Sequence, residues 1–251
     1  DSLEMNDADR EFIVKTINTI TRNPMNARTR VVGGVDVKKK DLVWRELIDA
    51  AIERGQRRWE NVEDLAFRAG VPSPTAAYAL RRLIEIGAVR QHHAGFAVVN
   101  PQKVLTSFCA SRSIVADTVA TVTLRESVLK KLADSQLAER LIKGGPEAAI
   151  MHLGGVNTVS DYTERIIYVR DEAALNALLE HADPFEPNRA EPNRGQISVL
   201  IADARAARTW RSHASFAQTY ADLFVTPGWQ SSEFRIALRD KFLDNRDWDQ
   251  Q

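Results

Sequence analysis

Residues 65–80 read LAFRAGVPSPTAAYAL, and this stretch decides the expected fold of the first half of the chain. Ala66 is small where two helices would cross, Gly70 can take the turn between them, and Pro74 falls where a helix needs no N–H. Ser73 is expected to cap and start the second helix. The small core between the helices would contain Val71, Ala76, Ala79 and Leu80. The spacing therefore predicts a helix-turn-helix whose second helix starts at Ser73.

The sequence on either side extends this prediction. Apolar residues recur at helical spacing from Asp41 to a stop at Gly55, and Asn61 is placed to cap the short helix that ends at Gly70. The segments that follow are two β-prone stretches, 88–91 and 96–99, the residues 92–95 that would join them as a hairpin, and a helix from Pro101. A hairpin after a helix-turn-helix is the pattern of a winged helix-turn-helix.

Such a domain would place the start of its second helix in the major groove of double-stranded DNA. Arg81 suits guanine or phosphate, while Thr75 and Tyr78 suit phosphate or a thymine methyl. The outward residues expected on this helix are Ser73, Thr75, Ala77, Tyr78, Arg81 and Arg82. Further DNA contacts are expected from the hairpin, at Arg90, His92 and His93, and from a basic arm, at Lys38, Lys39 and Lys40.

The charge distribution agrees with this interpretation. Lys plus Arg and Asp plus Glu are equal over the whole chain, at 34 each. Residues 1–112 nevertheless hold 18 basic and 14 acidic side chains, while residues 113–251 hold 16 and 20. Residues 22–103 hold 15 and 9, a local excess of positive charge that would attract a phosphate backbone. A solvated basic face would have the same composition.

The second half has mixed α/β character. It opens with an alternating β-branched run at 118–124, and a helix is expected over 126–143. Later segments are expected to be a short helix after 144–146, a strand at 165–169, a helix capped by Asp171, an exposed loop at 183–195, a strand at 197–201, and helices at 216–224 and 232–243. The fold class is therefore α+β, with an N-terminal helix and basic arm (1–40), a winged helix-turn-helix domain (41–112) and an α/β domain (113–251).

Several kinds of chemistry are not expected. Cys109 is the single cysteine, so no intrachain disulfide can form, and its apolar setting suits a core residue. The five histidines lack zinc-ligand spacing, and the Gly144-Gly145-Pro146 segment lacks the Lys-Ser/Thr ending of a phosphate loop. No catalytic set stands out, so we expect no catalytic residues, no metal and no cofactor. No stretch is long and apolar enough to span a bilayer, so a soluble cytoplasmic protein without a membrane partner is expected.

Four stretches together resemble one family. They are FAVVNPQKVL at 96–105, GGPEAA at 144–149, IIYV at 166–169, and SFAQTYADL at 215–223, with Glu233 and Ala237 behind the last. In this order they are similar to the AbiEi-type antitoxins and transcriptional regulators of type IV abortive-infection toxin-antitoxin systems. The resemblance covers roughly residues 41–243.

The resemblance implies a repressor that binds inverted repeats in its own promoter through the N-terminal domain. It also implies that the C-terminal domain counteracts a nucleotidyltransferase-like toxin, for which a direct complex is not required. A homodimer or two monomers binding in turn would both suit inverted repeats. Two other hypotheses stay open: a nucleotide- or nucleic-acid-modifying enzyme with an accessory winged helix, and a winged-helix protein-interaction module without DNA affinity.

Overall fold

The fold is mixed α+β, with helices before and after the main sheet. It is seen in a computed structural model that describes residues 38–124, 137–157, 165–184, 196–244 and 246–248, with residues 128, 132, 135 and 159. All of these belong to one compact unit, Val35–Gln251. The N-terminal helix expected within residues 1–40 lies outside the described residues. No helix in the described ranges has both the length and the apolar character needed to cross a bilayer.

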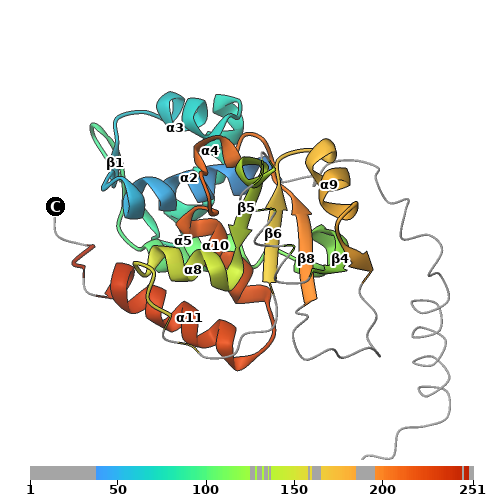
Figure 1. Ribbon diagram of the computed structural model, residues 1–251. Coiled ribbons are helices and arrows are strands. Elements are labelled where there is room, and N and C mark those ends of the chain that lie inside the picture. The colour runs from blue at the N-terminus through green and yellow to red at the C-terminus, as the bar shows by residue number, and fades with distance from the viewer. Residues whose placement is uncertain are drawn as a thin grey trace, which may run out of the picture. The chain divides into compact units, whose positions relative to one another are not determined.

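From residue 38 on, where the structure describes it, the first half has four helices and a small sheet (Figure 1). Its elements are α2 (Lys39–Glu53), β1 (Arg58–Trp59), α3 (Val62–Ala69), α4 (Ser73–Glu85), β2 (Val89–His92), β3 (Gly95–Val98) and α5 (Pro101–Cys109). The three strands pair in the order β1-β3-β2, antiparallel throughout. The expected hairpin is confirmed, and β1 is a third strand that the sequence analysis missed. The turn is shorter than expected, because His92 and Gly95 are themselves paired.

The second half is built on a five-stranded sheet in the order β5-β6-β8-β4-β7. Only β6 and β8 are parallel; the other pairs are antiparallel. The elements are α6 (Ile114–Asp117), β4 (Thr118–Thr123), the 3-10 turn η2 (Ala138–Arg140), β5 (Leu141–Gly144), α8 (Gly145–His152), β6 (Arg165–Val169), α9 (Glu172–Leu179), β7 (Asp183–Pro184), β8 (Gln196–Ile201), the 3-10 turn η3 (Ala207–Thr209), α10 (Phe216–Val225), α11 (Trp229–Arg239) and the π-turn η4 (Asp240–Asp244).

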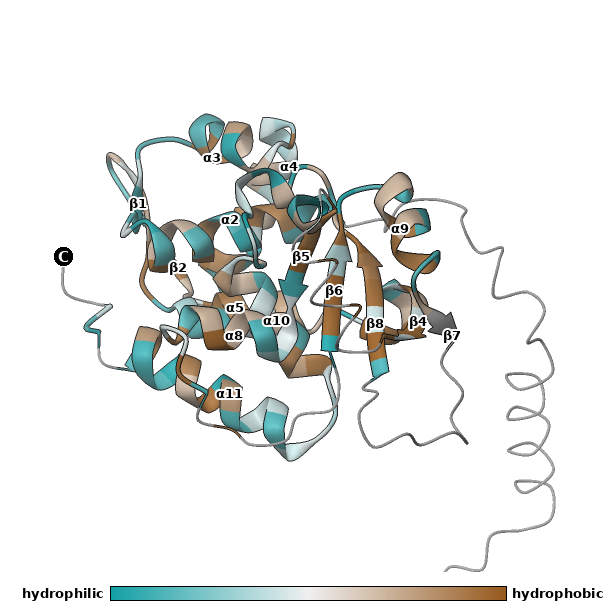
Figure 2. Ribbon diagram, viewed as in Figure 1, coloured by the Kyte–Doolittle hydropathy of each residue, from teal (hydrophilic) through white to brown (hydrophobic). Residues whose placement is uncertain are grey.

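Both faces of this sheet are covered, which explains why β6 and β8 are almost wholly apolar in Figure 2. Successive residues of a strand point to opposite faces. Ile167 and Val169 accordingly share a core with α9, whereas Ile166 and Tyr168 share one with Trp210. The second face also receives α8 and α10, which contact β6 and β5 respectively.

One hydrophobic core joins the two halves of the chain. Leu47 and Leu83 from the first half belong to the same buried cluster as Phe216 and Phe234 from the last helices. Helix α10 is central to it, since it packs against α2, α5, α8 and α11. The domain boundary expected between residues 112 and 113 therefore stays a prediction, because described residues on both sides of it share one hydrophobic core.

Three sequence expectations were wrong in detail. Ser73 is the first residue of α4 rather than its cap; Pro72 occupies the capping position and no side chain caps the helix. The helix expected to reach Lys143 stops earlier, because Leu141–Gly144 is strand β5, paired with β6. The last helix begins at Trp229 and ends at Arg239 instead of running over 232–243.

Two carboxylates of α2 accept hydrogen bonds from backbone N–H groups at the start of α10 and so fix the two helices together. Asp49 Oδ1 accepts a hydrogen bond from the Ala217 N–H at 2.9 Å, and Glu53 Oε1 accepts one from the Phe216 N–H at 2.6 Å. Burial, together with the neighbouring charge of Glu53, raises the pKa of Asp49 to about 8. Burial also raises the pKa of Glu53. Burial therefore favours the protonated form of Asp49 in the folded chain, although the hydrogen bond from the Ala217 N–H favours the ionised form.

Gly95→Ala should damage the small sheet. Gly95 has a φ of 120°, and a Cβ there would lie 2.0 Å from the Trp59 carbonyl oxygen in β1. We expect urea denaturation to give a loss of about 3 kcal/mol or more in the free energy of unfolding. The matched control is Gly55→Ala, because Gly55 also has positive φ (69°) but no atom within 4 Å of its Cβ position. It should cost about 1–2 kcal/mol; equal losses would refute the steric argument.

Asp49→Asn should weaken the pH dependence of stability. The ordinary pKa of the Asp49 carboxyl is 3.8 and its folded value is about 8. Its stabilising contribution is therefore complete below pH 3.8 and is lost as the pH rises through about 8. Asparagine keeps an acceptor for the Ala217 N–H without titrating, so the fall in unfolding free energy from pH 5 to pH 8 should be smaller than in the parent chain.

The control for this experiment is Asp171→Asn. A hydrogen bond from Arg140 lowers the pKa of Asp171, so this group titrates below pH 3.8 and contributes no slope between pH 5 and pH 8. Denaturation curves at both pH values measure the slope for each variant. An Asp49→Asn slope identical to that of the parent would contradict the assignment.

Candidate nucleic-acid interface

The geometry between α3 and α4 follows from local backbone chemistry. Asn61 caps α3 as expected, because its side chain accepts a hydrogen bond from the Asp64 N–H at 2.8 Å. Gly70 ends α3 in the left-handed region, with a φ of 67°. Leu65 and Ala66 are buried beneath the turn. The chain therefore reverses within a few residues and α4 starts directly after α3.

Helix α4 has one buried side and one exposed side. The residues expected to form its core are buried, namely Ala76, Ala79 and Leu80, and Leu83 is buried with them. Ala77, Arg81 and Arg82 are exposed, and Tyr78 is 68% exposed, a large fraction for an aromatic side chain. Ser73 and Thr75 are half-buried. The outward face predicted from the sequence is thus presented as a group along α4.

The two arginines on this face differ in their surroundings. Arg82 Nη1 lies 3.4 Å from the Glu85 carboxylate, one turn further along the helix. Arg81 forms no ion pair within the part of the chain that the structure describes. The guanidinium of Arg81 therefore combines full exposure with a charge that is not neutralised by a neighbouring described residue.

The three lysines at 38–40 are placed at the start of α2 rather than in an arm. Lys38 precedes the helix, and the helix begins at Lys39. The Lys40 Nζ lies 4.7 Å from the ring centroid of Trp44, whose Nε1–H donates to the Ala79 carbonyl in α4 at 3.1 Å. Lys40 is therefore connected through one side chain to the backbone of α4, and its ammonium is held near this part of the fold.

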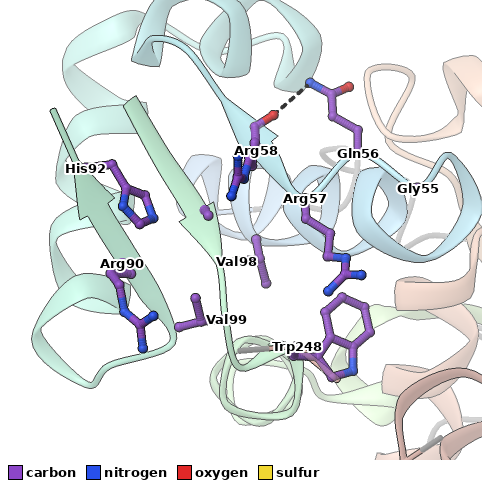
Figure 3. A pocket seen from close by; sticks show the side chains of 10 residues that line it. Gly55, Gln56, Arg57, Arg58, Arg90, His92, Val98, Val99 and Trp248 are labelled. Carbon is purple, nitrogen blue, oxygen red and sulfur yellow. Dashed lines mark hydrogen bonds between the residues drawn. The ribbon is translucent and has the colours of Figure 1, made fainter. Parts of the chain in front are cut away.

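The hairpin residues take different places. Arg90 and His92 line a pocket of about 380 Å³ on the sheet, shown in Figure 3, while His93 lies in the turn between the strands. Arg57 and Arg58, which the sequence analysis did not single out, line the same pocket. The adjacent pair Arg57 and Arg58 is visible in the sequence as a local concentration of positive charge. Strand β1, which begins at Arg58, has only two residues and was too short to recognise from the sequence.

Other arginines near α3 have structural roles. Arg68 donates to Asp64 at 3.1 Å and to Gln56 at 2.9 Å, so it ties α3 to the preceding loop. Arg208, from the second half, donates to the Arg68 carbonyl at 2.8 Å. The side chain of Arg205 packs beside Gly70, 3.3 Å from the position a Cβ would occupy there. The turn before α4 is therefore held from both halves of the chain.

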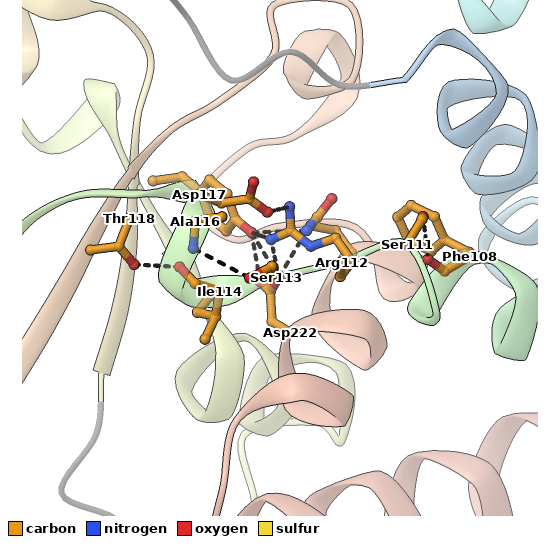
Figure 4. A network of polar contacts seen from close by, with 11 residues as sticks. Phe108, Ser111, Arg112, Ser113, Ile114, Ala116, Asp117, Thr118 and Asp222 are labelled. Atoms are coloured by element: carbon orange, nitrogen blue, oxygen red, sulfur yellow. Dashed lines mark hydrogen bonds and ion pairs between the residues drawn. The ribbon is translucent and has the colours of Figure 1, made fainter. Parts of the chain in front are cut away.

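The two halves also meet at a buried polar network (Figure 4). The Asp222 carboxylate in α10 accepts hydrogen bonds from Tyr168 Oη, from Arg112 Nη2 and from Gln218 Nε2, each at 2.8 Å. Arg112 lies between α5 and α6, and its Nη1 donates to Asp117 at 2.5 Å. Asp222 is fully buried. The network thus ties α10, the main sheet and the link from the first half together.

Burial governs the ionisation of this network. It raises the pKa of Asp222 despite the opposing charge of Arg112. Burial, with the charge of Asp222 adding to it, also raises the pKa of Tyr168 well above its usual range. Asp222 and Tyr220, both in α10, are buried. These positions therefore act in the folding of the chain.

Other chemistry has little support among the described residues. Burial raises the pKa of Cys109 to about 12, so its thiol is not activated for nucleophilic attack. No three His, Cys, Asp or Glu side chains in the described ranges are grouped to hold a metal ion. His152 and His213 lie edge to face with ring centroids 4.9 Å apart, and burial lowers the pKa of each.

Comparison of the chain with protein-family models, with curated proteins and with solved structures finds no match in any of the three. The exposed face of α4 and the charges around the small sheet therefore carry the functional argument by themselves.

Asp222→Ala should strongly destabilise the chain, because it leaves the buried Arg112 and Tyr168 without their shared partner. We expect the free energy of unfolding, measured by urea denaturation, to fall by about 3–5 kcal/mol. Asp117→Ala is the matched control. It removes the other carboxylate bound to Arg112, but the Asp117 side chain is 20% exposed and that of Asp222 is 0% exposed. A smaller loss for Asp222→Ala than for Asp117→Ala would contradict the central role of Asp222.

Proposed function

We propose that the first half of the chain is a winged helix-turn-helix that binds double-stranded DNA, and that the exposed face of α4 reads the sequence. The observation that carries this proposal is the outward row of Thr75, Tyr78 and Arg81 on a short helix that follows a tight glycine turn. A helix presented in this way suits the major groove, which is about 12 Å wide. The β2–β3 hairpin would be the wing.

The side chains on and near α4 would make different kinds of contact with DNA. A guanidinium at Arg81 can donate two hydrogen bonds to a guanine edge, and Tyr78 and Thr75 can contact phosphate or a thymine methyl. Ala77, which is exposed on the same helix, offers no long polar group, so base reading rests on few residues. Lys40 and Arg82 would add attraction for the backbone, which raises affinity without selecting a sequence.

We further propose that the chain acts as an AbiEi-like antitoxin that represses its own operon and counteracts a nucleotidyltransferase-like toxin, without catalytic activity of its own. The support is the order of resembling segments, together with their packing: α8 contacts both β6 and α10, the elements that contain the GGPEAA, IIYV and SFAQTYADL stretches. If the proposal is right, a nucleotidyltransferase should be encoded beside this chain, and co-expression of the two should restore the growth that this toxin alone prevents.

Arg81→Ala should weaken binding to the DNA upstream of the chain's own gene. Loss of a bidentate guanine contact costs about 1–3 kcal/mol, so a mobility-shift assay should show a dissociation constant raised by roughly 5- to 150-fold. Rescue from the toxin should persist in this variant, because Arg81 lies in the first half of the chain.

The control is Arg239→Ala, which removes a partly exposed arginine of equal charge from α11, where it pairs with Asp244 at 2.9 Å. Its operator affinity should match that of the parent chain. Equal weakening by both variants would show that Arg81 acts only through net charge. No shift of the upstream DNA by the parent protein at 50 mM salt would overturn the proposal in favour of a protein-interaction module, since DNA affinity rises steeply as salt is lowered.

A further inference from the structure

The pocket in Figure 3 lies on the outer face of the small sheet, the face turned away from the core. In an antiparallel sheet, directly opposite residues point to the same face. Trp59 and Phe96 are opposite one another and both are buried, so they define the inner face. Arg58 and Arg90 are each opposite Ala97, and they therefore share the outer face with it.

This register places the side chains of Arg58 and Arg90 on either side of Ala97, whose small methyl group forms the floor of the pocket. Neighbouring strands lie about 4.8 Å apart, so the backbones of Arg58 and Arg90 are separated by about 10 Å with only the methyl group of Ala97 between them. Side chains of this length can converge on one small anion above that methyl group. His92, two residues beyond Arg90 on β2, points to the same face.

A third guanidinium and an indole form one wall. Arg57 Nη1 donates to the Asp247 carbonyl at 2.9 Å, and its guanidinium lies 4.9 Å from the ring centroid of Trp248. This hydrogen bond uses one of the five N–H donors of Arg57 and fixes the side chain at the rim. Val99 adds apolar surface, and none of the described residues that line the pocket is acidic.

We propose that this pocket binds a nucleotide through its phosphate group. Guanidinium groups match phosphate oxygens in geometry and charge, and Val99 and the indole of Trp248 supply apolar surface for a base. A volume of about 380 Å³ falls within the range of small-ligand sites. The phosphate can belong to a free nucleotide or to a nucleic-acid strand, and both sources share this chemistry.

The site is separate from the DNA-reading surface proposed above. Arg81 and Arg82 do not line it, and its lining residues come from the loop at 55–57, the three strands and Trp248. The inference therefore does not depend on sequence reading by α4.

The test is titration calorimetry of the full chain with ATP, with inorganic phosphate and with a single-stranded oligonucleotide, all at one ionic strength. Arg90→Ala should weaken binding of the tighter of the two nucleotide-containing probes at least tenfold, whereas Arg239→Ala, which removes an arginine that does not line the pocket, should leave it within twofold. Tight binding of ATP would identify a free nucleotide as the ligand, and binding of the oligonucleotide alone would identify a strand. Inorganic phosphate, which lacks a base, should bind more weakly than either.

A second variant separates pocket shape from charge. Ala97→Val keeps every charge and suits a strand, but its larger side chain fills the floor between Arg58 and Arg90. It should weaken the same probe at least tenfold, while circular dichroism shows the parent fold. The proposal is overturned if neither nucleotide-containing probe binds the parent chain, or if binding is unaffected by both Arg90→Ala and Ala97→Val.

Discussion

The buried carboxylate of Asp222 is the interaction on which the rest of this structure depends. It satisfies a tyrosine hydroxyl from β6, a guanidinium from the link after α5 and an amide from its own helix. A charge in such a place is tolerated only when each of its partners is fixed. The same contacts therefore determine where α10 lies, and α10 is the helix against which α2, α5, α8 and α11 all pack.

A second buried charge, that of Arg45, also connects separate segments of the chain. Arg45 of α2 is buried between the rings of Phe108 and Trp210, with 5.7 Å from its guanidinium carbon to each centroid. Burial lowers the pKa of Arg45, and the neighbouring Asp49 opposes this. Because Phe108 belongs to α5 and Trp210 follows η3, one side chain links three segments distant in sequence. The polar core thus specifies how the two halves fit, in addition to the apolar contacts around it.

The elements that sequence reasoning predicted well are those with local signals. Asn61 and Asp171 cap their helices through hydrogen bonds to residues only three positions further along the chain. Gly70 turns the chain because glycine can adopt a positive φ. The outward face of α4 followed from helical periodicity. By contrast, β1 has only two residues, too few for an alternating sequence pattern that would predict a strand. Leu141–Gly144 is a strand because it pairs with β6, which is distant in sequence. The network around Asp222 joins residues up to 110 positions apart, and the arginine pocket needs three strands in register. Neither can be recognised before the chain is folded.

The turn between α3 and α4 has a consequence for communication within the molecule. Arg205 packs on Gly70 and Arg208 binds the Arg68 carbonyl, so the segment at 203–209 touches the turn immediately before α4. That segment follows directly from β8 in the main sheet. Any partner that binds the sheet and displaces the segment must also change the free energy of placing α4. Thermodynamic reciprocity then requires that occupancy of α4 changes the affinity for that partner by the same factor. A chain built in this way needs no moving domain to connect α4 with the main sheet.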